Sequence, residues 1–459
     1  MRFLGNILVS FKRRNPHSET AATLRTFSEW GFLHIMAIKL TASVLCFVDN
    51  TIKVEHIFAF LNHVFITLCY CYKIPNIKSK IRQTFYNFAI MNEIQQKLER
   101  NTLNTVSLFS GAGGLDIGAI MSGANIVWAN DKMREACDSY SKNIGTHIHR
   151  GDIDKLKPEL EELKGSVRLV IGGPPCQGFS VAGKMDADDE RSKLIWSYAD
   201  VIEILLPDAF VMENVKALGM LERWASVRTA LLSHLRSLGY SVGLCVLNAT
   251  DYDVPQARER MFIVGFKGSA DAQINLDMML KPYRKKAKTV REALSVLDKA
   301  GDGNNKSVCN AKITLTPNPV LRKSAYAGML FNGLGRPLKL DGYSATLPAS
   351  MGGNKTPIID EKALYEGKRP WVEQYHEELL NDISVAKHTD VPDYLRRLTI
   401  DEARVIQTFP LEYEFCGSQS SQYTQIGNAV PCNLAKAVCS MVIDVLNGRT
   451  NIIYSGLFS

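Results

Sequence analysis

The sequence predicts an α/β protein, with a doubly wound, mostly parallel sheet and a second, smaller domain. Three observations carry this prediction: short β-rich runs alternate with helical stretches from residue 105 onward, polar or glycine-rich turns follow those runs, and the alternation is lost over 267–395. At 459 residues the chain is long enough for two or three domains. Its 46% hydrophobic and 22% charged residues are ordinary globular values, which exclude a disordered, collagen-like or coiled-coil protein.

The excess of positive charge lies in the first hundred residues. These hold 13 of the 54 Lys and Arg and 6 of the 47 Asp and Glu, so the other 359 residues carry 41 of each sign. Net charge therefore gives no argument that the main body binds nucleic acid. The ten cysteines lack the paired C-x-x-C spacing of a zinc site, and we expect reduced thiols in a cytoplasmic protein, with no metal.

Residues 1–100 form an atypical apolar extension. The runs 31–49 and 54–72 approach the length of a membrane span, but Lys39 and His63 are among the polar residues that interrupt them. Three interpretations stay open: a pair of buried helices, a weak membrane hairpin, or residues that are not part of the working protein. We favour the third, with Met91 as the natural start.

The elements of the predicted sheet follow in order from residue 105. The strand runs are 105–109, 125–130, 167–172, 208–213, 241–249 and 260–266. Between the third and the fourth, apolar residues from Leu194 to Leu205 recur at helical spacing. Because ligands of such sheets bind beyond the carboxyl ends of the strands, we note the residues placed there: Gly111, Asp131, Cys176 and Glu213.

We divide the remainder by its pattern. Residues 101–266 are expected to form the catalytic and cofactor-binding domain, and 267–395 a target-recognition domain. Residues 396–459 are expected to return to the first domain. Thr399 and Glu402 have the spacing of a capping box at a helix start, and Pro431 stands where the last helix should begin.

The turn Gly111-x-Gly113 between strand and helix lets the backbone approach a ligand, although a plain tight turn explains it equally well. Asp131, at the end of the next strand, suits either ribose hydroxyls or the amino-terminal dipole of a helix. With Gly151-Asp152-Ile153 at the next crossover, the set favours an adenosine-containing ligand.

Pro174-Pro175-Cys176-Gln177 is a sharper signal. Two prolines stiffen the loop and hold Cys176 at the end of a buried strand, where its thiolate could act as a nucleophile. Glu213, at the end of the neighbouring strand, could stay protonated and serve as a general acid. Arg258 and Arg260 suit a carbonyl oxygen or phosphates, the alternative being a solvated charge cluster.

Residues 105–266 and 396–446 together resemble the cytosine-C5 DNA methyltransferase family of bacterial restriction-modification systems, motif by motif and in order. The motifs are FSGAGG (109–114), GDI (151–153), GGPPCQGFS (172–180), D-x-R-x-x-L (189–194), ENV (213–215), QARER (256–260), RRLT with EA (396–403) and QIGNAVP (425–431). The resemblance implies the S-adenosylmethionine-dependent methyltransferase fold and transfer of a methyl group to cytosine C5 in duplex DNA.

The resemblance also assigns residues. It implies cofactor binding by Phe109, Gly111, Gly113, Asp131, Asp152, Ile153, Pro175, Leu194, Asn428 and Val430. It implies catalysis by Cys176, Glu213, Arg258 and Arg260, and DNA binding by Ser180, Gln256, Thr346 and Leu347. One departure is Lys132, which stands where many members carry an aromatic residue that stacks on the adenine.

In this interpretation Cys176 attacks C6 of a cytosine flipped out of the duplex. Residues 267–395 read the target, and the basic run 281–288 meets phosphates unless it is only a solvated surface. We expect a monomer with a restriction endonuclease as a functional partner. Three alternatives are kept: a tRNA cytosine-C5 methyltransferase, a catalytically silent DNA-binding regulator, and a nicotinamide-dependent dehydrogenase.

Overall fold

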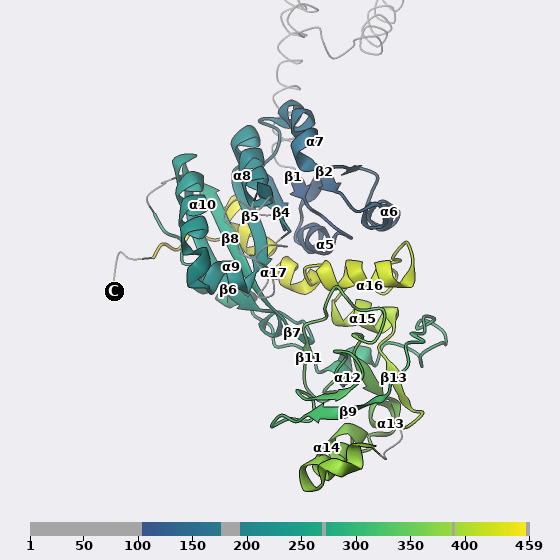
Figure 1. Ribbon diagram of the computed structural model, residues 1–459. Helices are drawn as coiled ribbons and strands as arrows, with labels where there is room; N and C mark the ends of the chain where they lie inside the picture. Colours follow the sequence, from purple (N-terminus) through teal and green to yellow (C-terminus); the bar gives the residue numbers. More distant parts are fainter. Residues whose placement is uncertain (1–102, 176–192, 269–271, 388–390, 456–459) are drawn as a thin grey trace, which may run out of the picture. The chain divides into compact units, whose positions relative to one another are not determined.

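The computed structural model of the protein describes residues 103–175, 193–268, 272–387 and 391–455 (Figure 1). The apolar runs 31–49 and 54–72 and the start expected at Met91 lie outside these residues. A seven-stranded sheet in the order β3-β2-β1-β4-β5-β8-β6 forms the centre of the first domain, which confirms the α/β prediction. Its strands are β1 (Asn104–Leu108), β2 (Asn125–Asp131), β3 (Ile148–Arg150), β4 (Leu169–Gly172), β5 (Ala209–Val215), β6 (Tyr240–Asn248) and β8 (Glu259–Lys267).

All neighbouring strands from β3 to β5 pair in parallel, whereas β8 pairs antiparallel with both β5 and β6. The six predicted strands are present within one or two residues of their predicted ends. The short strand β3 was not predicted, because three residues are too few to show a period.

Helices cover both faces of the sheet because the strands are apolar on both sides. Leu169 and Ile171 of β4 face one core, while Val170 between them faces the other. The first core is closed by α5 (Gly114–Met121), α6 (Arg134–Asn143), α11 (Leu276–Leu280) and α17 (Cys432–Leu446). The second is closed by α7 (Ile153–Leu160), α8 (Lys193–Leu205) and α10 (Ala225–Ser237), with the short helix α9 (Lys216–Met220) beside β8.

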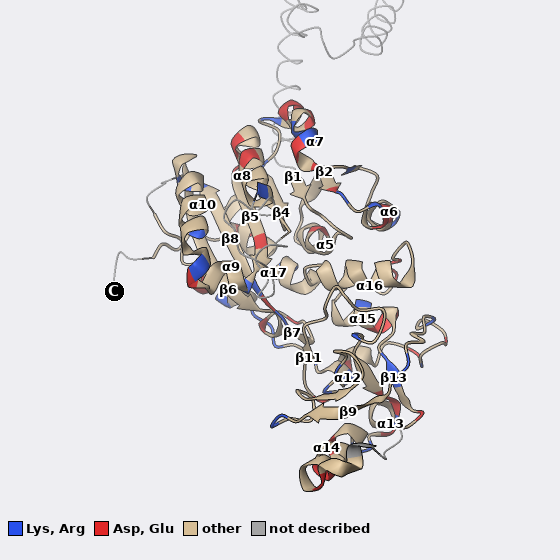
Figure 2. Ribbon diagram, viewed as in Figure 1, with Lys and Arg blue, Asp and Glu red and all other residues tan. Residues whose placement is uncertain are grey.

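The outer surfaces of these helices carry both signs of charge. Figure 2 shows Lys and Arg interspersed with Asp and Glu along α7 and α8. Lys157 of α7 pairs with Asp154 on its own helix and with Asp200 on α8. A surface of mixed sign agrees with the neutral charge balance of residues 101–459.

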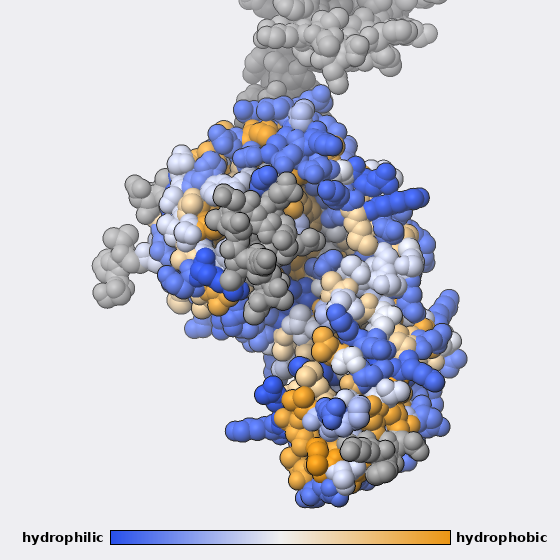
Figure 3. Space-filling view, viewed as in Figure 1, coloured by the Kyte–Doolittle hydropathy of each residue, from blue (hydrophilic) through white to orange (hydrophobic). Residues whose placement is uncertain are grey.

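The second domain is built from short elements around its own apolar cores. They are α12 (Val290–Leu294), β9 (Leu315–Val320), β10 (Met329–Phe331), β11 (Ser344–Ala345), β12 (Ile358–Asp360), α13 (Glu361–Glu366), α14 (Trp371–Asn381), β13 (Leu395–Arg397), α15 (Ile400–Ile406) and α16 (Gln419–Asn428). Figure 3 shows apolar residues gathered on its surface around β9 and α14, where Val320 and Leu380 are exposed. That face is unsuited to phosphates.

The change from one apolar core to the other does not fall at the domain boundaries expected from the sequence. Residues 274–280 pack into the first core, although they were expected in the second domain. Apolar residues of α15 and α16 such as Ile400 and Ile426 pack into the second domain, whereas Phe409 and Tyr413 between them pack against Ile117 of α5, and α17 packs into the first core. An amphipathic pattern shows that a segment has a buried face but not which of two cores receives it.

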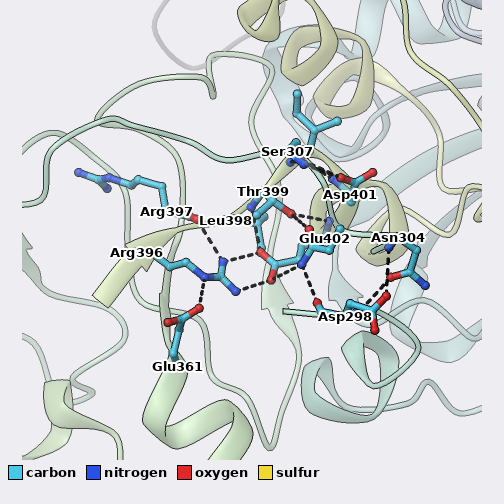
Figure 4. Close-up of polar contacts among 12 residues, drawn as sticks. Asp298, Asn304, Ser307, Glu361, Arg396, Arg397, Leu398, Thr399, Asp401 and Glu402 are labelled. Atoms are coloured by element: carbon cyan, nitrogen blue, oxygen red, sulfur yellow. Dashed lines mark hydrogen bonds and ion pairs between the residues drawn. The ribbon is translucent and has the colours of Figure 1, made fainter. Parts of the chain in front are cut away.

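A polar network holds α15 in the second domain (Figure 4). Thr399 and Glu402 form the capping box expected from their spacing. Arg396 donates to both carboxylate oxygens of the buried Glu402 and to Glu361 at the start of α13. One guanidinium thus joins two helices of the second domain.

The helix α17 begins directly after Pro431, as predicted, and packs closely against α5. Gln419–Leu446 has the length and composition of a bilayer span, but the apolar side chains of its α17 part are buried in the first core. The contact with α5 is close because Gly118 has no side chain. A methyl group there would lie 2.4 Å from Ala435 Cβ and 2.5 Å from Lys436 N.

We therefore predict that Gly118→Ala destabilises the protein by about 1 to 3 kcal/mol, the usual range for an overpacked core. Urea unfolding followed by circular dichroism measures the change. Gly353→Ala is the matched control, since a methyl group at Gly353 would meet no atom within 4 Å. Equal stability of the two variants would show that the α5–α17 contact is looser than described.

Candidate active site

The carboxyl ends of β1 and β2 form a glycine turn and a carboxylate that face each other. Phe109 and Gly111 both have left-handed backbone angles, with φ of 55° and 56°. The Gly111 N–H donates to Asp131 Oδ2 at 2.8 Å, and the Met133 N–H donates to Oδ1 at 2.7 Å. A methyl group at Gly111 would meet no atom within 4 Å, so the backbone here borders open space that a ligand could enter.

Two opposing effects act on the pKa of the Asp131 carboxyl. Burial raises its pKa, and the hydrogen bonds from the backbone of Met133 and Gly111 act to lower it. Each oxygen accepts one of these bonds and keeps a further lone pair, which is the acceptor capacity that ribose hydroxyls require.

Gly113 has a packing role in the structure. A methyl group there would lie 2.2 Å from Ile144 Cδ1, because the turn is pressed against the end of α6. Of the two glycines predicted to contact a cofactor, Gly111 borders open space and Gly113 packs against Ile144, and both contacts stay predictions.

The next crossover places Asp152 at the amino terminus of α7 and Ile153 in the second core. Asp152 Oδ1 accepts a bond from the Asp154 N–H, and Asp152 Oδ2 lies 3.6 Å from Lys132 Nζ. Lys132, the departure noted in the sequence, is thus ion-paired with Asp152. The Lys132 side chain is 81% exposed, so this pair contributes little to stability.

The carboxyl-terminal segment closes against the same turn. Val430 is buried, and its carbonyl oxygen would lie 2.3 Å from a methyl group at Gly114. The Tyr413 hydroxyl donates to the Ala112 carbonyl, while Asn428, at the end of α16, is exposed. Of the two residues predicted here, Val430 adjoins the glycine turn directly.

The carboxyl ends of β4 and β5 bring together the predicted catalytic region. A methyl group at Gly173 would lie 3.0 Å from Glu213 Oε2, so this carboxyl rests against the backbone after β4. Asn214 Nδ2 donates to the Pro174 carbonyl at 3.1 Å. Cys176 and Ser180 lie outside the described residues, and the contacts of the chain leading to Cys176 are those of Gly173 with Glu213 and of Pro174 with Asn214.

Glu213 forms an ion pair with Arg260, whose Nε lies 2.9 Å from Glu213 Oε1. The two side chains are only 12% and 15% exposed. Antiparallel pairing of β8 with β5 brings them together, because Val215 is opposite Arg260 in the register. Burial raises the pKa of Glu213, and the charges of Arg260 and Arg258 act to lower it.

Arg258 lies in the interior, where it joins two other segments. It is 2% exposed, and its guanidinium donates to the carbonyls of Leu347 at 3.3 Å and Gly427 at 2.9 Å. Burial, aided by Arg260, lowers its pKa to about 9. The guanidinium of Arg258 thus connects the segments of Leu347 and Gly427.

Two of the expected DNA contacts are also internal. Gln256 and Leu347 have no exposed surface. The Leu347 N–H donates to Gln256 Oε1, and Gln256 Nε2 donates to Gln407 Oε1. Gln256 is thus bonded within the protein, and the DNA contacts expected at these two positions stay predictions. Thr346 is exposed, with its hydroxyl donating to the Ala257 carbonyl.

Other predicted residues lie at the edges of the site. Leu194 is half-buried on α8 and packs against the second core. The basic side chains of 281–288 are exposed, yet Tyr283 within this run packs against the first core, so the run belongs to the sheet domain. Among the described residues, no cluster of His, Cys, Asp or Glu is suited to a metal ion.

Three buried polar residues near the site have no role predicted from the sequence. Asn214 was visible only as the middle residue of ENV, and Gln407 follows the end of α15 with no motif of its own. Asp116 lies in α5 with no exposed surface, and the Tyr140 hydroxyl donates to it at 2.9 Å. A polar residue within an apolar helix pattern was the only available signal for Asp116.

The comparisons with known proteins agree with this geometry. The sequence model of the C-5 cytosine-specific DNA methylases matches residues 103–444. The chain therefore belongs to the C-5 cytosine-specific DNA methylase family, and the predicted enzyme class, a DNA (cytosine-5-)-methyltransferase, is confirmed.

Its relatives include type II methyltransferases. M.MthTI of Methanothermobacter thermautotrophicus is 32% identical over 354 residues, covering 76% of this chain and 99% of that protein. M.BspRI of Lysinibacillus sphaericus is 33% identical over 400 residues, covering 76% and 83%.

Solved structures share the fold. A putative DNA modification methyltransferase from an E. coli prophage has a TM-score of 0.54 at 22% identity, covering 75% of this chain and all of that one. The S. pombe Dnmt2 methyltransferase has a TM-score of 0.55 at 19% identity, covering 76% of this chain and 100% of that one.

Buried Asp116 generates a prediction about pH. Burial raises its pKa to about 6 from 3.8, so the folded state holds this proton more tightly than the unfolded state does. Ionisation of the buried Asp116 therefore lowers the free energy of unfolding only slightly near pH 4, and by its full amount above pH 6. Asn keeps an acceptor for Tyr140 and cannot ionise.

Asp116→Asn should accordingly gain stability over the wild type as pH rises. The difference in free energy of unfolding should widen by about 1 kcal/mol between pH 5 and pH 8. Urea titrations of both proteins at several pH values measure it. A difference that stays constant or narrows with pH contradicts the assignment of a raised pKa to this carboxyl.

Proposed function

We propose that this protein transfers the methyl group of S-adenosylmethionine to C5 of a cytosine in a specific duplex DNA sequence, through a transient bond between Cys176 and C6. The observation that carries the proposal is the Glu213–Arg260 ion pair, which lies against Gly173 in the chain leading to Cys176. A proton donor and a cation are then neighbours at one edge of the sheet, beside the backbone of Gly173, which precedes the proposed nucleophile by three residues in the sequence.

S-adenosylmethionine, when bound, supplies an electrophilic methyl group. The residues at the ends of β1 and β2 fit it, since Gly111 borders open space and the Asp131 carboxylate keeps acceptor capacity for ribose hydroxyls. Phe109 would stack on the adenine, Asp152 and Ile153 would border its edge, and Val430 would close the pocket from the carboxyl-terminal side.

The chemistry requires activation of the base, because cytosine C5 alone is a poor nucleophile. The Cys176 thiolate adds to C6 while Glu213 gives its proton to N3, so the electron pair of the C5–C6 double bond becomes available at C5. Arg260 polarises the C2 carbonyl. Once C5 carries the new methyl group, a base removes the C5 proton, N3 returns its proton to Glu213, and the electron pair re-forms the C5–C6 double bond and expels the thiolate.

Duplex DNA is the proposed substrate because a second domain with its own cores stands beside the site and because relatives are named type II methyltransferases. The target cytosine would have to leave the helix to meet Cys176. We propose that a monomer acts in the cytoplasm and protects host DNA from a cognate restriction endonuclease.

Mapping of methylated cytosines in DNA from cells that express the protein tests the substrate and defines the target sequence. In parallel, the purified protein is offered duplex DNA and tRNA. Methyl transfer to tRNA alone would replace the proposal with the RNA alternative, and tight duplex binding without any transfer would support the silent regulator.

Cys176→Ala should abolish methyl transfer to the mapped duplex and leave binding of S-adenosylhomocysteine within about twofold of the wild type, because only the nucleophile is lost. Incorporation of labelled methyl groups and calorimetric titration measure the two effects. Cys416→Ala is the control, since Cys416 is a half-buried free thiol outside the proposed chemistry. Full activity of Cys176→Ala, or the failure of 5-fluorocytosine in the duplex to trap a covalent complex, would refute the proposal.

Lys132→Trp should tighten binding of S-adenosylhomocysteine roughly 2- to 10-fold, because an aromatic pair contributes about 0.5 to 1.5 kcal/mol beyond area burial. Lys132→Met removes the same ion pair with Asp152 but adds no ring, and it should show no such gain. Calorimetric titration compares the three proteins. If Trp binds the ligand no better than Met, position 132 does not face the adenine.

A further inference from the structure

Two buried glutamines form a continuous chain of hydrogen bonds between three parts of the molecule. The Leu347 N–H donates to Gln256 Oε1 at 3.0 Å, Gln256 Nε2 donates to Gln407 Oε1, and Gln407 Nε2 donates to the Ala429 carbonyl. Both glutamines have no exposed surface. In each link an amide donates in the same direction, from the second domain toward the carboxyl-terminal segment.

The first end of the chain is the segment of the second domain around Leu347. Strand β11 pairs in parallel with β7 (Gln256–Ala257), and the Thr346 hydroxyl donates to the Ala257 carbonyl. Arg258, the residue directly after β7, donates to the Leu347 carbonyl. The segment is thus joined to the chain that continues into Arg260 and, through the Leu347 N–H, to Gln256.

The other end is the segment that closes the cofactor turn. Ala429 adjoins Val430, whose carbonyl lies against Gly114 at the start of α5. Gln407 also accepts a bond from the Cys432 N–H at its own main-chain carbonyl, which ties it to the start of α17. A change at Gln407 therefore reaches the residues directly after Gly111, where the open space lies.

The links resist being broken singly. A buried amide that loses its partner costs about 1 to 3 kcal/mol, so both side chains must move together or not at all. A chain of packed and hydrogen-bonded side chains is the kind of contiguous network that can carry coupling between two sites.

We infer that Gln256 and Gln407 are positioning residues that couple DNA binding in the second domain to cofactor binding at the glycine turn. The inference rests on the proposed function, since it takes duplex DNA and S-adenosylmethionine as the two ligands. Neither glutamine touches a reacting atom; they act through Leu347 and Ala429. By linkage, each ligand then strengthens the binding of the other by the same factor.

The test is a binding cycle without turnover. The dissociation constant of S-adenosylhomocysteine is measured by calorimetry with and without a saturating duplex that carries the mapped target sequence, and the ratio is the coupling factor. The wild type should give a factor of about 5 or more. Gln407→Met and Gln256→Met break the chain at different links, and each should bring the factor to within about twofold of one.

Tyr423→Phe is the matched control. It removes one buried hydrogen bond, from the Tyr423 hydroxyl to the Leu398 carbonyl, but lies outside the chain. This variant should keep the wild-type factor, which separates loss of coupling from general loosening of the second domain.

A second measurement needs no variant. Adding the duplex to the wild type should slow amide hydrogen exchange in 112–117 and 429–433 at least as much as S-adenosylhomocysteine does. Unchanged exchange there, a wild-type factor of one, or glutamine variants that keep the wild-type factor would each overturn the inference. A protein that binds neither ligand would instead refute the proposed function, and the inference with it.

Discussion

The antiparallel pairing of β8 with β5 is the constraint on which the candidate site depends. It sets Arg260 against Glu213 where both are largely withdrawn from water. A carboxylate or a guanidinium alone in such surroundings would be strongly disfavoured, and the charge of each offsets the desolvation cost of the other. The balance leaves the carboxyl with a raised pKa, although two arginines lie nearby. That balance keeps a carboxyl of raised pKa in contact with a permanent cation.

The site also depends on the return of the chain. Residues 425–433 follow the second domain in the sequence and pack against the first domain. The Ser139 hydroxyl donates to Gln425, Val430 meets the start of α5, and α17 packs on Gly118. The last helix is therefore part of the first core, and the cofactor turn is completed by residues distant in sequence. The two domains are joined by this return as well as by the direct link after β8.

Much of the fold could be predicted because buried strands and amphipathic helices leave a period in the sequence. The strands of two or three residues, β7 and β3, leave none. The antiparallel direction of β8 could not be predicted either, since an apolar strand buried on both faces has the same pattern in a parallel and in an antiparallel sheet. At the site, motifs predicted ligand contacts for Glu213, Arg260, Arg258 and Gln256 alike, and gave no sign that Arg258 and Gln256 are buried. The structure shows that these two bind neighbouring segments of the protein.

The sequence by itself determined the enzyme family, the order of the six main strands, the capping box at Thr399 and the start of the last helix at Pro431. All of these depend on residues that are close in the chain or on motifs with fixed spacing. Only the tertiary structure decided which core receives α15 and α16, which glycine faces open space, and which polar residues connect segments. Those features depend on distances between residues far apart in sequence, and a one-dimensional pattern contains no such distances.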